Sequence, residues 1–250
     1  MRHLRKHAEM ERLFGADFLP ISKDKAPLVS FSAGPAPRDA RAQGSPKKKQ
    51  TEPPTKPRSS EGSTYPREFE QFREEVLGCT KCGLCSTRKQ VVFGVGPLEV
   101  PLMFVGEAPG QDEDQQGEPF VGRAGQLLTR TLQEIGVRRA QVYIGNILKC
   151  RPPGNRTPQP DEMAACMPWL VRQIGFVKPK IICGLGNIAV QTLLATKTGI
   201  TRLRGTYGEA HGVRFFATFH PAYILRNMAE HAVFKKDLAT VCRDAGLLPA

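Results

Sequence analysis

The sequence predicts an α/β fold with three layers, α/β/α, around a central parallel sheet of four strands. Four short apolar runs have the length of buried strands, at residues 101–106, 141–147, 180–183 and 214–219. Helical patterns lie between these runs, and strands that alternate with helices form parallel sheets covered on both faces. A chain of 250 residues is long enough for one such domain and a tail.

The helices are predicted from apolar side chains at helical spacing. The first begins at Arg67, after which Phe69, Phe72, Val76 and Leu77 fall on one face. Three more are expected: one carrying Leu127, Leu128, Leu132 and Ile135 that ends at Gly136, one at residues 161–176, and one at residues 188–195. We therefore expect the folded domain to span residues 67–250.

Residues 1–66 differ in composition from the rest of the chain. Residues 33–66 contain no Val, Ile, Leu, Met, Phe, Trp or Cys but seven prolines. Such a segment buries too little apolar surface to offset its ordering entropy, so we expect a disordered, Pro-rich, basic extension. Residues 1–18 fit a short amphipathic helix. The extension is interpreted as a solvated linker or as a nonspecific tether to nucleic acid.

The net charge favours a polyanionic partner. Lys and Arg number 36 against 24 Asp and Glu, a net charge of +12, which attracts nucleic acid or anionic lipid. No apolar run approaches the ~18 residues that a membrane span needs. The seven cysteines are an odd number, and no secretory signal precedes them, so we expect reduced thiols and a cytoplasmic, nucleoid-associated protein with no membrane partner.

Five cysteines have the spacing of a sulfur site. Cys79, Cys82 and Cys85 form C-x2-C-x2-C, while Cys150 and Cys166 lie far along the chain. Two close thiolates and two remote ones can bind zinc or hold a four-iron cluster. Four ligands suffice, so one of the three clustered cysteines is expected to be spare, and the spacing alone does not identify it.

Polar, Gly-rich segments follow each predicted strand, at residues 106–125, 149–156, 184–187 and 220–226. The carboxyl ends of parallel strands meet at one edge of a sheet, where ligands bind. Phe120 can stack on a base, Asn146 can read the amide-like edge of a pyrimidine, and His220 can donate to a ligand oxygen. Each residue also has an alternative: core packing for Phe120, a turn or cap for Asn146, and a purely structural role for His220.

These segments together resemble one known family. The motifs are Gly106-Glu107-Ala108-Pro109-Gly110, Gly117-x-Pro119-Phe120-Val121-Gly122, Asn146-x-x-Lys149-Cys150-Arg151-Pro152-Pro153 and His220-Pro221-Ala222. In this order, with these cysteines, the sequence resembles the family-four, iron-sulfur uracil-DNA glycosylases from about residue 69 to residue 238. The resemblance implies hydrolysis of the N-glycosidic bond of uracil in DNA, leaving an abasic site. It also implies a [4Fe-4S] cluster on Cys79, Cys82, Cys150 and Cys166, with Cys85 spare.

The resemblance also implies a role for each site residue. Glu107 and His220 are the expected catalytic residues, and the expected substrate-binding residues are Gly106, Ala108, Phe120, Gln126 and Asn146. Phe120 would stack on the flipped uracil, Asn146 would pair with its edge, and His220 would face its O2. Ala108 stands where the best-known uracil-DNA glycosylases have a water-activating Asp, which leaves the role of Glu107 less defined.

DNA contacts are expected on both sides of this site. A base must swing out of the duplex to reach such a pocket, so Leu225 is the candidate wedge and Arg226 a phosphate or gap-filling contact. Lys149, Arg151 and Arg156 are candidate backbone contacts.

The expected enzyme is a monomer that acts on uracil-containing DNA, and its product is a substrate for abasic-site repair enzymes. No candidate Schiff-base lysine lies in the motifs, so lyase activity is not expected. No long basic insertion follows Asn146, so covalent crosslinking to DNA is disfavoured. Two alternatives stay open: a noncatalytic iron-sulfur protein that binds DNA, and a zinc-ribbon nucleic-acid module.

Overall fold

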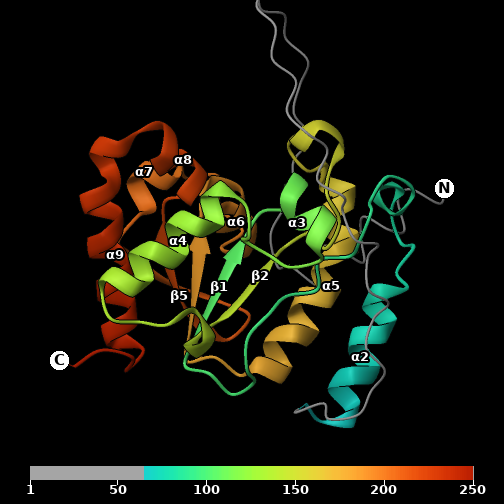
Figure 1. The fold of residues 1–250 in the computed structure, drawn as a ribbon, viewed down its shortest axis with the longest axis horizontal. Helices are drawn as coiled ribbons and strands as arrows, with labels where there is room; N and C mark the ends of the chain where they lie inside the picture. Colours follow the sequence, from blue (N-terminus) through green and yellow to red (C-terminus); the bar gives the residue numbers. More distant parts are fainter. Residues whose placement is uncertain (1–64, 250) are drawn as a thin grey trace, which may run out of the picture. The chain divides into compact units, whose positions relative to one another are not determined.

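A computed structural model describes residues 65–249 and shows a twisted sheet between two layers of helices (Figure 1). The strands are β1 (Leu102–Gly106), β2 (Tyr143–Asn146), β3 (Ile181–Leu185), β4 (Tyr207–Ala210) and β5 (Val213–Thr218), arranged in the order β2-β1-β3-β5-β4. The disorder and the amphipathic helix predicted for the N-terminal extension concern residues that lie outside the described range.

The α/β prediction is confirmed, with a correction to the number of strands. β1, β2, β3 and β5 are mutually parallel and correspond to the four predicted runs. The fifth strand, β4, was not predicted and pairs antiparallel with β5 at the edge of the sheet. Its sequence Tyr-Gly-Glu-Ala is short and largely exposed, so it lacks the continuous apolar run of a buried parallel strand.

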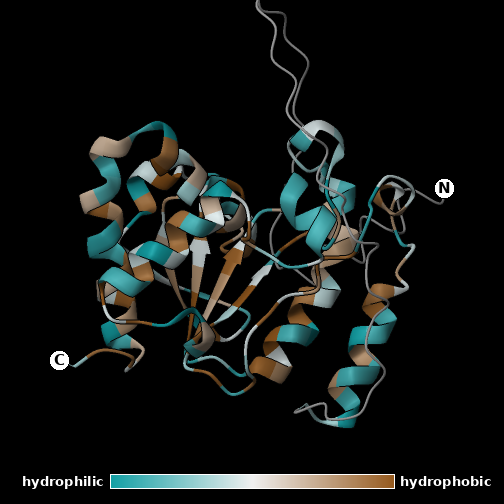
Figure 2. Ribbon diagram, in the orientation of Figure 1, coloured by the Kyte–Doolittle hydropathy of each residue, from teal (hydrophilic) through white to brown (hydrophobic). Residues whose placement is uncertain are grey.

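Alternate side chains of each strand enter two separate cores. Met103 and Val105 of β1 pack into one core, whereas Leu102 and Phe104 pack into the other. The first core is covered by α2 (Arg67–Leu77), α5 (Pro160–Val177) and α6 (Asn187–Leu193), and the second by α4 (Arg123–Glu134), α8 (Pro221–Arg226) and α9 (His231–Asp244). Hydrophobic strands lie between helices with polar outer faces (Figure 2). Leu77, expected on the apolar face of α2, is instead exposed at the end of the helix.

Short elements complete the chain between these layers. They are α3 (Gln111–Gln116), α7 (Ile200–Leu203) and the 3-10 turns η1 (Gly83–Ser86), η2 (Arg139–Gln141), η3 (Pro153–Asn155) and η4 (Met228–Glu230). Within residues 65–249, no helix is both long and apolar enough to span a membrane. The four parallel strands end at Gly106, Asn146, Leu185 and Thr218, so the Gly-rich segments that follow them meet at one edge of the sheet.

Candidate active site

A cavity of about 590 Å³ opens at this edge. Its lining comes from the segments after all four parallel strands, as the sequence predicted. Residues predicted for the site that line it are Glu107, Ala108, Phe120, Asn146, Arg156, His220 and Arg226. Segments that are more than 100 residues apart in sequence therefore form one site because their strands are parallel neighbours.

The floor of the cavity depends on the last residue of β1. A Cβ atom on Gly106 would lie 2.5 Å from Asn146 Oδ1 and 2.6 Å from the Phe120 ring, so only glycine lets these side chains approach each other. Asn146 is 2% exposed, and its Oδ1 has no hydrogen-bond partner. A buried acceptor without a partner costs free energy unless a ligand donates to it. Asn146 is therefore arranged to receive an N–H from a bound molecule.

Phe120 is held in a strained conformation beside this acceptor. Its φ of 54° lies in the left-handed region, which costs a non-glycine residue about 1–3 kcal/mol. Its buried ring lies 5.6 Å from the His220 ring, centroid to centroid. Gly125 allows this arrangement, since a Cβ atom there would lie 1.9 Å from the Phe120 backbone. The ring is thus fixed as one wall of the cavity.

Glu113 is a residue of this wall that the sequence reasoning missed. Its carboxylate accepts hydrogen bonds from the backbone N–H groups of Gly110, Val121 and Gly122. One side chain of α3 therefore ties the loop after β1 to the loop that carries Phe120. The signal available in the sequence was the spacing of Gly110 and Glu113, which places the carboxylate where a capping box bonds back to the start of a helix.

His220 presents a defined face to the cavity. The backbone N–H of Ala222 donates to its Nδ1 at 3.1 Å, so the proton of the neutral ring resides on Nε2. Burial, with a smaller contribution from Arg226, lowers the pKa of His220 to about 4. The ring is consequently a neutral Nε2–H donor at physiological pH, suited to an oxygen that becomes negative during a reaction.

This protonation state is directly observable. Nitrogen NMR of protein labelled at histidine should show His220 as the Nε2–H tautomer from pH 8 to about pH 5, because its pKa is far below the ordinary value. The resonance is assigned by its loss in the His220→Gln variant. A ring that titrates near pH 6.5, or that carries its proton on Nδ1, would contradict the hydrogen bond from Ala222.

Glu107 directly follows β1 and is half-buried at the cavity wall. Desolvation raises the pKa of its carboxyl group, which makes the carboxylate a stronger base than an exposed one. Ala108, next to it, adds no polar group. Within the motif at residues 106–110, Glu107 is consequently the residue that brings a carboxylate to the cavity wall.

The geometry can be compared with known proteins. Residues 93–242 match the family model described as the uracil DNA glycosylase superfamily, and this range contains β1 to β5 and every cavity residue named above. The chain belongs to this superfamily. The family-four resemblance of the sequence is confirmed by curated relatives named type-4 uracil-DNA glycosylase.

Three of these relatives show how far the similarity extends. The Pyrobaculum aerophilum protein is 44% identical over 180 residues, which cover 69% of this chain and 92% of the relative. The Thermotoga maritima protein is 48% identical, covering 65% and 87%. The Sulfurisphaera tokodaii protein is 42% identical, covering 72% and 86%. The similarity therefore spans most of each relative's length.

Cysteines of this superfamily member converge on a second, smaller hollow. Cys79, Cys82, Cys85, Cys150 and Cys166 all line it. In residues 65–249, no three His, Cys, Asp or Glu side chains already form a group able to hold a metal ion. Burial raises the pKa of Cys166 to about 11 and also raises the pKa of Cys150, so a bound metal would have to deprotonate these thiols.

Hydrogen-bond donors and cations surround the sulfur atoms. The Cys79 sulfur accepts from Trp169 Nε1 at 3.2 Å, and the Cys150 sulfur accepts from Arg88 Nη1 at 3.2 Å. N–H donors of this kind stabilise thiolates bound to a metal cluster. Lys149 adds a buried amino group that also lines this hollow and interacts electrostatically with Cys166 and Cys150. The donor set therefore fits a negatively charged thiolate cluster.

Two predicted contacts are corrected by the structure. Lys149, expected on the DNA backbone, is only 2% exposed, and its Nζ donates to the Asn146 carbonyl and to Gln173 Oε1. It cannot reach a phosphate from there. Gln126, expected to bind substrate, is exposed, lies outside the cavity lining, and donates to the Val121 carbonyl at 3.4 Å. It lies on the outer side of the loop that carries Phe120.

The other candidate DNA contacts surround the cavity or lie near it. Arg226 and Arg156 line the cavity, and Arg156 is also paired with Glu162. Arg151 is half-buried and donates to Asn155 Oδ1. The side chain of Leu225 is half-buried against the second core.

Two other apolar side chains near Leu225 in the sequence are more exposed. The large apolar side chains exposed in this segment are Tyr223, at 36%, and Met228, at 57%. The sequence analysis selected Leu225 as the wedge and neither of these two residues. Both now belong among the groups that a bound strand would meet first.

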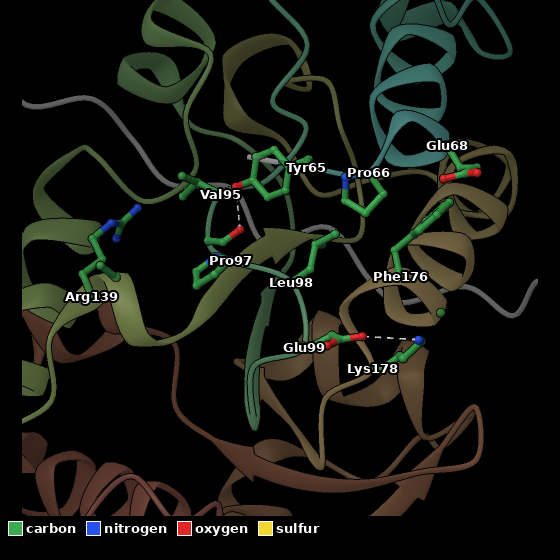
Figure 3. A pocket seen from close by; sticks show the side chains of 13 residues that line it. Tyr65, Pro66, Glu68, Val95, Pro97, Leu98, Glu99, Arg139, Phe176 and Lys178 are labelled. Carbon is green, nitrogen blue, oxygen red and sulfur yellow. Dashed lines mark hydrogen bonds and ion pairs between the residues drawn. The ribbon is translucent and has the colours of Figure 1, made fainter. Parts of the chain in front are cut away.

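A larger cavity of about 1190 Å³ lies at the opposite edge of the sheet (Figure 3). Its walls include residues 95–99, Arg139, Phe176 and Lys178, which precede β1, β2 and β3 rather than follow them. Lys178 and Glu99 form an ion pair of 3.5 Å across it. It contains none of the predicted site residues. The 590 Å³ cavity, with its unpaired acceptor, is therefore the candidate active site.

Proposed function

We propose that this protein is a monofunctional uracil-DNA glycosylase that hydrolyses the bond between uracil N1 and the sugar C1′ at the 590 Å³ cavity. The observation that supports this most strongly is the buried, unpaired Oδ1 of Asn146 beside the Phe120 ring and the His220 imidazole. Uracil presents O2, N3–H and O4 along one edge. An acceptor flanked by donors complements this edge.

Each side chain contributes a separate part of the binding. Asn146 Oδ1 accepts from uracil N3–H, and its Nδ2 donates to O4. Phe120 stacks on the ring plane, which is worth about 1–3 kcal/mol per base. Gly106 keeps the space between Asn146 and Phe120 open. Together these groups select a planar base with an acceptor, a donor and an acceptor along one edge.

Cleavage places negative charge on uracil and positive charge on the sugar. The neutral Nε2–H of His220 donates to O2 and stabilises the uracil anion as N1 leaves with the bonding electrons. Glu107 faces the sugar, where its carboxylate stabilises the oxocarbenium-like C1′ and orients the attacking water. The water oxygen bonds to C1′ and loses a proton. The uracil anion takes up a proton in turn, so that uracil is released as the neutral base. The products are free uracil and an abasic site.

The DNA surface follows from the same arrangement. Arg226 and Arg156 at the cavity rim and Arg151 near it contact backbone phosphates, so affinity should fall with salt. Leu225 is proposed as the wedge that enters the duplex after the nucleotide swings out, and the more exposed Met228 lies three residues further along. The enzyme acts as a monomer in the cytoplasm on nucleoid DNA, and an enzyme that processes abasic sites consumes its product.

The sulfur site is proposed to hold a [4Fe-4S] cluster on Cys79, Cys82, Cys150 and Cys166. When bound, the cluster supplies a covalent link between the segment before β1 and the segments after β2. Arg88 supports this assignment from the protein side, since it bonds both the Cys79 carbonyl and the Cys150 sulfur. Cys85, on the turn η1, remains the spare thiol.

The deciding experiment measures excision and metal content on one preparation. Oligonucleotides with a single uracil, thymine or hypoxanthine are incubated with the protein and then treated with alkali, which cuts abasic sites. Cleavage at uracil but not thymine, seen only after alkali, is the expected result. Intact uracil strands with iron-loaded protein would favour a noncatalytic DNA-binding relative. Zinc without iron or sulfide would favour the zinc module and overturn the cluster assignment.

A further inference from the structure

We propose that Lys149 is a positioning residue that holds Asn146 in its uracil-reading conformation and is itself fixed by the cysteine site. The proposal rests on the role of Asn146 given above. Lys149 lies three residues after Asn146 and directly before Cys150, so one short segment carries a base-reading side chain, a lysine and a proposed cluster ligand.

The side chain of Lys149 contacts the main chain of Asn146 from the protein interior and does not itself line the 590 Å³ cavity. Its Nζ donates to the carbonyl oxygen of Asn146 at 2.8 Å. The N–H of the same peptide group belongs to Ile147 and donates to the Gly106 carbonyl at 2.9 Å, and the next N–H, of Leu148, donates to the Glu107 carbonyl at 3.1 Å. The peptide that follows Asn146 is thus held from two directions. Loss of the Lys149 contact leaves this buried carbonyl without its donor.

The main chain of Lys149 contacts the cysteine site. Its N–H lies 3.4 Å from the Cys166 sulfur, and its carbonyl accepts from Val92 N at 2.8 Å. The backbone of Lys149 is therefore placed by the segments around the sulfur atoms, while its side chain reaches through the core to Asn146. A displacement of the cysteine segments would therefore move the amino group that holds the Asn146 carbonyl.

A buried amino group needs partners, and those of Lys149 are specific. Its second acceptor is Gln173 Oε1, at 2.7 Å. Gln173 lies on α5 and in turn donates to the Phe93 carbonyl and the Tyr143 hydroxyl. In residues 65–249, no carboxylate forms an ion pair with Lys149, whereas the sulfur atoms of Cys150 and Cys166 lie near it. Thiolates of a bound cluster would supply the missing negative charge.

This arrangement distinguishes Lys149 from an ordinary core residue. An apolar side chain of similar length would fill the same volume and keep the fold. It would not hold the Asn146 peptide. Loss of Lys149 should therefore weaken binding of the base and spare contacts with the DNA backbone, since the Lys149 side chain is buried and cannot contact a phosphate.

The test compares three variants of the iron-loaded, full-length protein. Lys149→Met removes the donor, Gln173→Met removes the group that orients it, and Tyr143→Phe removes a hydroxyl at the far end of the same network. Binding is measured to two duplexes: one with a 2′-fluoro-deoxyuridine, whose glycosidic bond resists cleavage, and one with a tetrahydrofuran abasic analogue. Iron per protein and kcat and KM for uracil excision are recorded beside these affinities.

The expected pattern is selective. Lys149→Met should bind the uracil duplex about three to ten times more weakly, as for a lost buried hydrogen bond, and bind the abasic duplex like the parent. Its kcat should fall more than its KM rises. Gln173→Met should show a smaller loss of affinity for the uracil duplex and a smaller fall in kcat. Tyr143→Phe should match the parent in both.

Three outcomes would overturn the proposal. One is an iron-loaded Lys149→Met protein with the parent's affinity for both duplexes. Another is an equal loss on both duplexes, which marks a general structural defect. The third is a Tyr143→Phe loss equal to that of Lys149→Met. If Lys149→Met fails to fold, Gln173→Met decides by the same comparison. Failure of the parent protein to excise uracil would instead refute the proposed function.

Discussion

Replacement of His220 by alanine is expected to lower kcat for uracil excision by about 10²–10³-fold, the usual effect of losing one donor to a developing oxyanion. The side chain places a neutral Nε2–H in the cavity because Nδ1 is occupied by the Ala222 N–H. Uracil O2 gains charge mainly as the glycosidic bond breaks, so the contact strengthens in the transition state. The loss should therefore appear in the rate constant of the chemical step, measured under single-turnover conditions, with little change in binding of uncleaved DNA.

Two further variants make this test specific. His220→Gln keeps a side-chain N–H donor and should recover part of the lost rate. His211→Ala replaces an exposed histidine in the turn between β4 and β5, outside the cavity lining, and should retain the parent's rate. Equal rates for the parent and His220→Ala would remove His220 from the mechanism. Equal losses in His220→Ala and His211→Ala would point to folding rather than catalysis.

The fold could be predicted because buried parallel strands leave continuous apolar runs in the sequence. The runs that became β1, β2, β3 and β5 are buried on both faces of the sheet, so nearly every position is apolar. β4 could not be found in this way. It is a short edge strand paired with β5, and its two central residues are exposed, so it leaves no continuous apolar run in the sequence.

The site was predictable to the extent that its residues contact a ligand. Phe120, Asn146 and His220 occur in motifs at strand ends, and parallel pairing brings such ends together. Glu113 was missed because it acts on backbone N–H groups, which any sequence possesses. Lys149 was misassigned because lysines are mostly exposed, and only the packed structure shows this one inside the core.

Replacement of Asn146 by alanine is the second change with a large expected effect. The two proposed hydrogen bonds to N3–H and O4 would be lost together, and such bonds to a charge-gaining base are worth about 1.5–3 kcal/mol each. We expect excision of uracil to fall by about 10²–10³-fold or more. The buried Oδ1 has no partner in the protein, so its removal breaks no internal hydrogen bond and should leave the thermal stability unchanged or slightly raised.

A large loss of excision together with an unchanged thermal stability distinguishes a ligand-binding role of Asn146 from a structural one. A residue that supports the fold loses stability and activity together, whereas a residue arranged for a ligand loses activity alone. Thermal unfolding, iron content and affinity for the tetrahydrofuran duplex should therefore match the parent in Asn146→Ala, while uracil excision nearly disappears. A melting temperature several degrees lower, with a parallel loss of abasic binding, would show that Asn146 supports the cavity rather than reads the base. Parent-like excision would show that the unpaired oxygen does not meet the substrate.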